Sequence, residues 1–167
     1  MSEFYTMKIA GLERHLPICP LNEHIDIAGF IIFGDVELTV KASEELLKKL
    51  PEFDYIVTPE AKSIPLAYEM SRQCGKKYFV ARKRAKLYMR NPVEVNVRSI
   101  TTDAVQTLIL DGADGEEIRG KRVVVLDDVI STGESLKAMD ALMEKFDVLP
   151  PPPRTEQNKT KQLLSYI

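Results

Sequence analysis

The stretch from residue 123 to residue 135 constrains the fold of this chain more than any other. It reads Val-Val-Val-Leu-Asp-Asp-Val-Ile-Ser-Thr-Gly-Glu-Ser, and a helix is expected from Leu136. Four apolar residues indicate a buried parallel strand that stops at two adjacent carboxylates, Asp127 and Asp128. Open α/β sheets bind ligands at the carboxyl ends of their strands, and helix N-termini attract anions. We therefore expect a ligand here that carries both hydroxyl groups and a phosphate.

The remaining segments alternate between short apolar runs and helical patterns, which predicts an α/β fold with a mainly parallel sheet flanked by helices. An apolar stripe from Ala42 to Leu50 predicts a helix that Asp35 precedes and Pro51 ends. A second helix begins near Pro65 and ends at Gly75. Strands are expected at 55–57, 77–81 and 123–126, and a hairpin is expected from the runs 93–97 and 105–110. Asp111-Gly112 and Asp114-Gly115 are expected to form turns.

Length and charge exclude several classes of function. A chain of 167 residues with a net charge of −2 fits one domain and gives no reason to expect nucleic acid as a partner. The sequence contains no signal pattern at its start and no apolar run long enough to cross a membrane. Cys19 and Cys74 lie outside any metal or redox spacing, which favours a reduced, cytoplasmic protein.

The stretch 123–135 closely resembles the signature of the type I phosphoribosyltransferases, and the resemblance covers roughly residues 10–146. It implies the Rossmann-like fold of that family and the substrate phosphoribosyl pyrophosphate (PRPP). By this resemblance, Asp127 and Asp128 are the catalytic residues that face the ribose hydroxyls. The loop that follows them would bind the 5′-phosphate; it consists of Ser131, Thr132, Gly133, Glu134 and Ser135.

Two further segments are expected to bind the pyrophosphate of PRPP. The loop after the first sheet strand, Glu60, Ala61, Lys62 and Ser63, resembles the family's pyrophosphate loop, and a cis peptide bond would lie between Glu60 and Ala61. Lys62 supplies a cation where adenine-type members have arginine. The basic cluster after the next strand would also contact the leaving group, with Arg82 and Lys83 as the first candidates and Lys86 as the next.

The base-binding region is the part that the sequence defines least. The resemblance places a small hood over the purine at residues 1–35 and a flexible catalytic hairpin loop between Leu87 and Gln106. Phe30 and Phe33 are weak candidates for stacking on the base. The loop lacks the Leu-Glu-Tyr sequence of many adenine-specific members, and its run Ser99–Asp103 looks more like xanthine-type and purine-repressor-like branches.

The resemblance implies a purine phosphoribosyltransferase that forms a nucleoside 5′-monophosphate and pyrophosphate in purine salvage. Adenine is the favoured base and xanthine or hypoxanthine the second, since Asp-Asp at 127–128 stands where the hypoxanthine-guanine branch has Glu-Asp. Mg²⁺ would bind together with PRPP, without direct protein ligands, and the protein is expected to be a homodimer. The alternatives are a non-catalytic PRPP or purine sensor, or a truncated inactive homologue.

The end of the chain departs from the family. The expected organisation is one domain at 1–149, with hood 1–35 and core 36–149, followed by a tail at 150–167. The tail begins with four prolines, which cannot form a central strand, and continues as a polar, linker-like segment. The strand at 123–126 is therefore expected to lose its partner along one edge.

Overall fold

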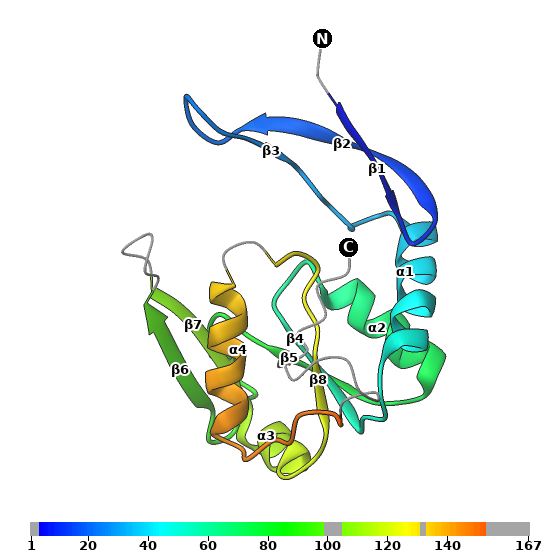
Figure 1. The fold of residues 1–167 in the computed structure, drawn as a ribbon. Coiled ribbons are helices and arrows are strands. Elements are labelled where there is room, and N and C mark those ends of the chain that lie inside the picture. The colour runs from blue at the N-terminus through cyan, green and yellow to red at the C-terminus, as the bar shows by residue number, and fades with distance from the viewer. Residues whose placement is uncertain (1–3, 99–104, 131–132, 153–167) are drawn as a thin grey trace.

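The computed structural model describes residues 4–98, 105–130 and 133–152. The strands are β1 (Phe4–Ile9), β2 (Leu12–Pro20), β3 (Asp26–Ala28), β4 (Tyr55–Pro59), β5 (Tyr78–Ala81), β6 (Val93–Arg98), β7 (Val105–Leu110) and β8 (Val123–Val125). The helices are α1 (Val36–Lys49), α2 (Ile64–Cys74), α3 (Gly112–Ile118) and α4 (Glu134–Glu144) (Figure 1). Within these ranges no helix combines the length and the apolar character that crossing a bilayer requires.

A three-stranded parallel sheet in the order β5-β4-β8 forms the centre of the fold. Its side chains alternate between two apolar clusters, one on each face of the sheet. Ile56, Val124 and Leu126 pack with buried residues of α1 and α2, whereas Val57 and Val123 pack with residues of α4 and the β6–β7 hairpin. A sheet buried on both faces has nearly continuous apolar strands, which explains the Val-Val-Val-Leu run.

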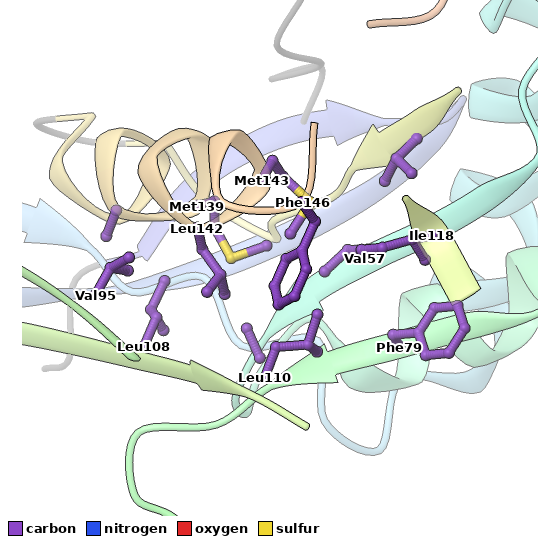
Figure 2. Packing of buried hydrophobic residues seen from close by; sticks show 13 residues of the cluster. Val57, Phe79, Val95, Leu108, Leu110, Ile118, Met139, Leu142, Met143 and Phe146 are labelled. Carbon is purple, nitrogen blue, oxygen red and sulfur yellow. The ribbon is translucent and has the colours of Figure 1, made fainter. Parts of the chain in front are cut away.

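Helix α4 packs against both the central sheet and the β6–β7 hairpin. Figure 2 shows Met139, Leu142 and Met143 of α4 pointing toward the residues of the hairpin and sheet, and all three side chains are almost fully buried. Phe146, just after α4, fills the space beside Gly115, where an added Cβ would lie 2.0 Å from its ring. This packing positions the start of α4 directly after the β8 loop, at the carboxyl end of the sheet.

The N-terminal residues form a separate antiparallel sheet in the order β1-β2-β3 (Figure 1). Arg14 on β2 ties this sheet to the start of α1, since its guanidinium binds both carboxylate oxygens of Asp35 at 2.6 and 3.0 Å. Asp35 also caps α1 by accepting a hydrogen bond from the Leu38 N–H at 3.0 Å. Ile32, between β3 and α1, is fully buried in the apolar cluster that includes residues of α1 and α2.

The structure confirms most of the elements expected for the core. Asp35 caps the first helix, proline lies in the first turn of α2, and Gly75 ends α2 in the left-handed conformation with φ +71°. The runs from 93 and 105 form the expected antiparallel hairpin, with Val95 opposite Leu108. The signature strand pairs in parallel with β4, as expected.

Two expectations about local structure were wrong. The segment Gly112–Ile118 forms helix α3 and not two turns, because Asp111 caps it by accepting a hydrogen bond from the Ala113 N–H at 3.0 Å. Glycine is required at position 115 of this helix because the Phe146 ring occupies the space that a larger side chain would need. Helix α4 begins at Glu134, two residues before the expected Leu136, because Gly133 provides its cap with φ +75°.

The outer edge of β8 pairs with the chain only briefly among the described residues. The Val123 N–H donates to the Leu149 carbonyl at 3.1 Å, and the Leu149 N–H donates to the Lys121 carbonyl at 2.8 Å. In the same parallel register, the next donor would come from Pro151, whose ring nitrogen has no hydrogen. The expected loss of a full partner strand therefore begins one residue pair later than the sequence indicated.

Candidate active site

Three loops meet at the carboxyl end of the parallel sheet. They follow β4, β5 and β8, and together with the start of β7 and of α4 they enclose a cavity of about 600 Å³. The residues that line it are Pro59, Glu60, Ala61, Lys62, Ser63, Lys83, Arg84, Val105, Gln106, Thr107, Leu108, Asp127, Asp128, Val129 and Ser135. This is the edge at which open α/β sheets bind ligands.

The loop after β4 has the backbone geometry expected from the sequence. The peptide bond between Glu60 and Ala61 is cis, which confirms that prediction. Two buried hydroxyls fix the loop to the sheet: Thr58 donates to the Leu126 carbonyl of the neighbouring chain segment at 2.9 Å, and Ser63 donates to the Pro59 carbonyl at 3.1 Å. The two hydroxyl oxygens lie 2.7 Å apart. Thr58 was not expected to support the site, since a threonine within a strand carries no functional signal.

Glu60 joins the β4 loop to the basic cluster. Its carboxylate accepts hydrogen bonds from the Arg82 guanidinium and from the Lys83 backbone N–H, both at 3.1 Å. Burial raises the pKa of Glu60, but the Lys83 N–H and the positive charges of Arg82 and Lys86 together hold that pKa below its usual value. Arg82 also donates to the Tyr88 hydroxyl at 3.2 Å. Arg82 therefore supports the loops, while Lys83 and Arg84 line the cavity.

The two acids that follow β8 lie in different surroundings. Asp128 is 5% exposed, and its Oδ2 accepts no hydrogen bond from the described residues. The Lys62 ammonium lies 3.4 Å from that oxygen. Asp127 accepts the Asp128 backbone N–H at 2.9 Å. Burial, followed by the side-chain interaction with Asp128 and the negative charge of that residue, raises the pKa of Asp127 to about 6, although the Asp128 backbone N–H and the Lys62 charge act in the opposite direction. Both acids are poised to accept hydrogen bonds from hydroxyl groups of a ligand.

The expected phosphate loop is only partly within the described residues. Ser131 and Thr132 lie outside them, whereas Gly133, Glu134 and Ser135 line a second cavity of about 190 Å³ at the start of α4. This smaller cavity also contacts Lys62 and Asp127. Gln106 of β7 donates to the Ser135 hydroxyl at 3.5 Å, which brings the hairpin against the phosphate loop. Backbone amides at a helix start suit a phosphate.

The structure does not bring every predicted residue to the cavity. Four predicted residues are not among the described residues that line either cavity: Arg82, Lys86, Phe30 and Phe33. Phe30 packs against the apolar cluster of α1 and α2, and Phe33 is half exposed. The catalytic loop tip Ser99–Asp103 lies outside the described residues. Conversely, Arg84 and Gln106 line the cavity without having been proposed as site residues. For Arg84 the basic run was an available signal, and Gln106 was marked only as the end of the expected catalytic hairpin loop.

Comparison with known proteins assigns this arrangement to a family. Residues 35–149 match the phosphoribosyl transferase domain, which covers the central sheet, its helices and both cavities. The chain belongs to this family. The family resemblance seen in residues 123–135 is thereby confirmed, and so is the α/β fold that it implied.

The relatives carry two different substrate names. The chain is 36% identical over 113 residues to the hypoxanthine/guanine phosphoribosyltransferase of Methanothermobacter thermautotrophicus, covering 67% of this chain and 55% of that one. It is 32% identical over 124 residues to the adenine phosphoribosyltransferase of Thermosipho africanus, covering 69% and 70%. The match thus spans little more than half of the first relative. Named relatives of both kinds match the chain, so the preference for adenine indicated by the Asp-Asp pair stays a prediction.

Solved structures show the same fold. The adenine phosphoribosyltransferase of Thermoanaerobacter pseudethanolicus superposes with a TM-score of 0.67 at 20% identity, covering 81% of this chain and 78% of that one. The Saccharomyces cerevisiae enzyme, solved with adenine and an imino-altritol bisphosphate, gives 0.65 at 23% identity, covering 81% and 79%. At these identities the likeness concerns the fold alone.

The raised pKa of Asp127 predicts a pH-dependent cost of folding. The folded protein holds this proton up to about pH 6, while the unfolded chain releases it near pH 4, so stability falls as pH rises through this window. Asp127→Asn removes the cost and keeps an oxygen that accepts the Asp128 N–H. We expect the variant to be more stable than the wild type at about pH 8, with a smaller difference at about pH 4.5.

Urea unfolding at both pH values measures this difference. Asp26→Asn, at an exposed strand position, is the matched control and should change stability little at either pH. An Asp127→Asn gain that is equal at both values would contradict the raised pKa.

Proposed function

We propose that this chain is a purine phosphoribosyltransferase, which transfers the phosphoribosyl group of PRPP to a purine base and releases pyrophosphate. The observation that carries the proposal is the convergence of three kinds of group on one edge of the sheet. Two acids, a helix-start phosphate cavity and three cations, Lys62, Lys83 and Arg84, surround adjoining cavities. A sugar that carries a phosphate and a pyrophosphate matches this set of groups.

The two acids suit the ribose. Its hydroxyls can donate to Asp127 and Asp128, and the Oδ2 of Asp128 has no other donor among the described residues. The negative charge of the pair would also stabilise positive charge that develops on the ribosyl carbon as pyrophosphate departs. The base nitrogen would attack that carbon directly, with inversion, so that no side chain need act as a nucleophile. The work of the protein is then to position the reactants and to stabilise charge.

The cations suit the leaving group. Pyrophosphate departs with several negative charges, and cations aimed at it stabilise the transition state more than the bound substrate. Lys83 and Arg84 line the larger cavity, held there by the turn that Glu60 fixes through the Lys83 N–H. The earlier assignment of Arg82 and Lys86 to the pyrophosphate remains a prediction. The contacts of Arg82 with Glu60 and Tyr88 support a positioning role for it.

Mg²⁺ fits this site as a partner of the substrate. Its direct ligands would come from PRPP, and the waters that it keeps would donate to carboxylates such as Asp127 and Asp128. When bound, it would neutralise part of the pyrophosphate charge. Within the described residues no cluster of three acids, histidines or cysteines lies close enough to hold a metal ion without the substrate.

The identity of the base remains a prediction. We favour adenine, as the sequence resemblance indicated, and xanthine is one alternative from that resemblance. Hypoxanthine and guanine are further alternatives, because named relatives of both kinds match this chain at similar identity. The hood residues and the tip of the hairpin would contact the base, and Phe30 and Phe33 remain candidates for stacking. A role in purine salvage follows from the reaction proposed, and a cytoplasmic location stays a prediction from the sequence.

We also propose that the protein is a homodimer. The outer edge of β8 pairs with Leu149 alone among the described residues, and open sheet edges promote association. Sedimentation velocity over a wide range of protein concentrations should show a dimer that persists on dilution. A monomer at every concentration, with full activity, would contradict this part of the proposal.

Turnover of PRPP tests the proposed function directly. Pyrophosphate release should be followed with Mg²⁺, PRPP and adenine, hypoxanthine, guanine or xanthine in turn, and one base should support multiple turnovers. Asp128→Ala should lower kcat/KM by about 10²–10³, the scale for the loss of one preorganised polar group. Asp147→Ala is the control, because Asp147 is exposed and pairs with Arg119 away from the site.

The outcomes separate the competing functions. Near-native turnover by Asp128→Ala would remove the role assigned to Asp128. PRPP binding without turnover of any base would favour the sensor or the inactive homologue. Absence of PRPP binding by the wild type would contradict both the catalytic function and the sensor function.

A further inference from the structure

Lys62 lies where the two cavities of the site adjoin. The larger cavity contacts the β4 loop, Lys83 and Arg84, and the smaller one contacts the start of α4. Four residues line both: Lys62, Asp127, Val129 and Ser135. Lys62 is the one cation in this shared set, so an anionic group in either cavity attracts its ammonium.

The Lys62 ammonium has a partner within the protein. It lies 3.4 Å from the Oδ2 of Asp128, an oxygen that accepts no hydrogen bond from the described residues. A buried carboxylate without a donor or a nearby cation is costly, so Lys62 supplies compensation that Asp128 otherwise lacks. The lysine side chain is 52% exposed, and its flexible stem allows the ammonium to move without a change of backbone.

The two halves of a sugar pyrophosphate therefore make different demands on this pair. A pyrophosphate group draws the ammonium toward itself and leaves Asp128 uncompensated. Sugar hydroxyls have the opposite effect, because they donate to Asp128 and release Lys62. Each half of the ligand thus changes the cost of binding the other half.

We propose that the Lys62–Asp128 pair couples recognition of the ribose hydroxyls to recognition of the pyrophosphate. A sugar phosphate and pyrophosphate, added as separate ligands, should then each bind more tightly when the other is present. This inference rests on the proposed function, since it assigns a means of regulation to the same site. A protein with this coupling discriminates against free pyrophosphate and favours ligands that present both groups together.

The effect depends on lysine at this position. An ammonium is a compact charge that serves one partner well, whereas a guanidinium has five donors and can contact two anions at once. Arginine at position 62 would therefore contact Asp128 and the pyrophosphate together, and the coupling would be weaker.

Calorimetric titration with pyrophosphate tests the proposal at constant Mg²⁺, with and without saturating ribose 5-phosphate. The wild type should bind pyrophosphate at least about fivefold more tightly when ribose 5-phosphate is present, the lower end of typical coupling between sites. Inorganic phosphate, which can fill the smaller cavity but carries no sugar hydroxyls, should not reproduce this gain.

Three variants assign the coupling to the pair. Asp128→Asn frees Lys62, so pyrophosphate alone should bind more tightly than to the wild type and the gain from ribose 5-phosphate should disappear. Asp127→Asn removes the same charge without removing the 3.4 Å partner of Lys62, and it should keep most of the gain. Lys62→Arg should bind pyrophosphate with a reduced gain.

Three results would overturn the proposal. The first is a wild type that binds both ligands with affinities independent of each other, an outcome that leaves the proposed function standing. The second is coupling of wild-type size in a fourth variant, Lys62→Met, which would show that the coupling does not pass through this residue. The third is a wild type that does not bind ribose 5-phosphate on its own, in which case the proposed function fails together with the coupling.

Discussion

The parallel pairing of β4 with β5 and β8 is the constraint on which the site depends. Because the three strands run in the same direction, the loops that follow them all emerge at one edge of the sheet. Residues near 60, 83 and 128, which are far apart in the chain, therefore line one cavity. The apolar clusters on both faces of the sheet fix this arrangement, and the Thr58 hydroxyl adds a bond from β4 to the carbonyl of Leu126.

Electrostatics then give the edge its chemical character. Acids follow β8 and bases follow β5, and the residues between them, Glu60 and Lys62, each contact the opposite charge. Glu60 is well compensated, which fits a structural role. Among the described residues, the Oδ2 of Asp128 accepts no hydrogen bond and has the half-exposed Lys62 ammonium 3.4 Å away, and burial is the largest cause that raises the pKa of Asp127 to about 6. Such incompletely compensated groups are costly in the free protein and mark the place where ligand groups fit.

Much of the core could be predicted because its signals are local. The strand at 123–126 is an apolar run, Gly75 is a helix terminator, and the alternation at 93–97 indicates a hairpin strand. The cis bond at Glu60–Ala61 could be placed only through the family resemblance. Helix α3 was misread, because Asp-Gly is a turn signal and the fit of Gly115 to Phe146 is a contact between distant residues. The contacts of Arg82 and the position of Gln106 likewise depend on tertiary packing, which sequence patterns do not encode.

The central claim is that PRPP occupies this edge with its ribose on the acids. A crystal structure of the protein with PRPP and Mg²⁺ measures this most directly. The account predicts ribose hydroxyls within hydrogen-bond distance of Asp127 and Asp128, the 5′-phosphate at the start of α4, and the pyrophosphate beside Lys62 and Lys83. PRPP bound elsewhere, or bound with its ribose away from both acids, would contradict it.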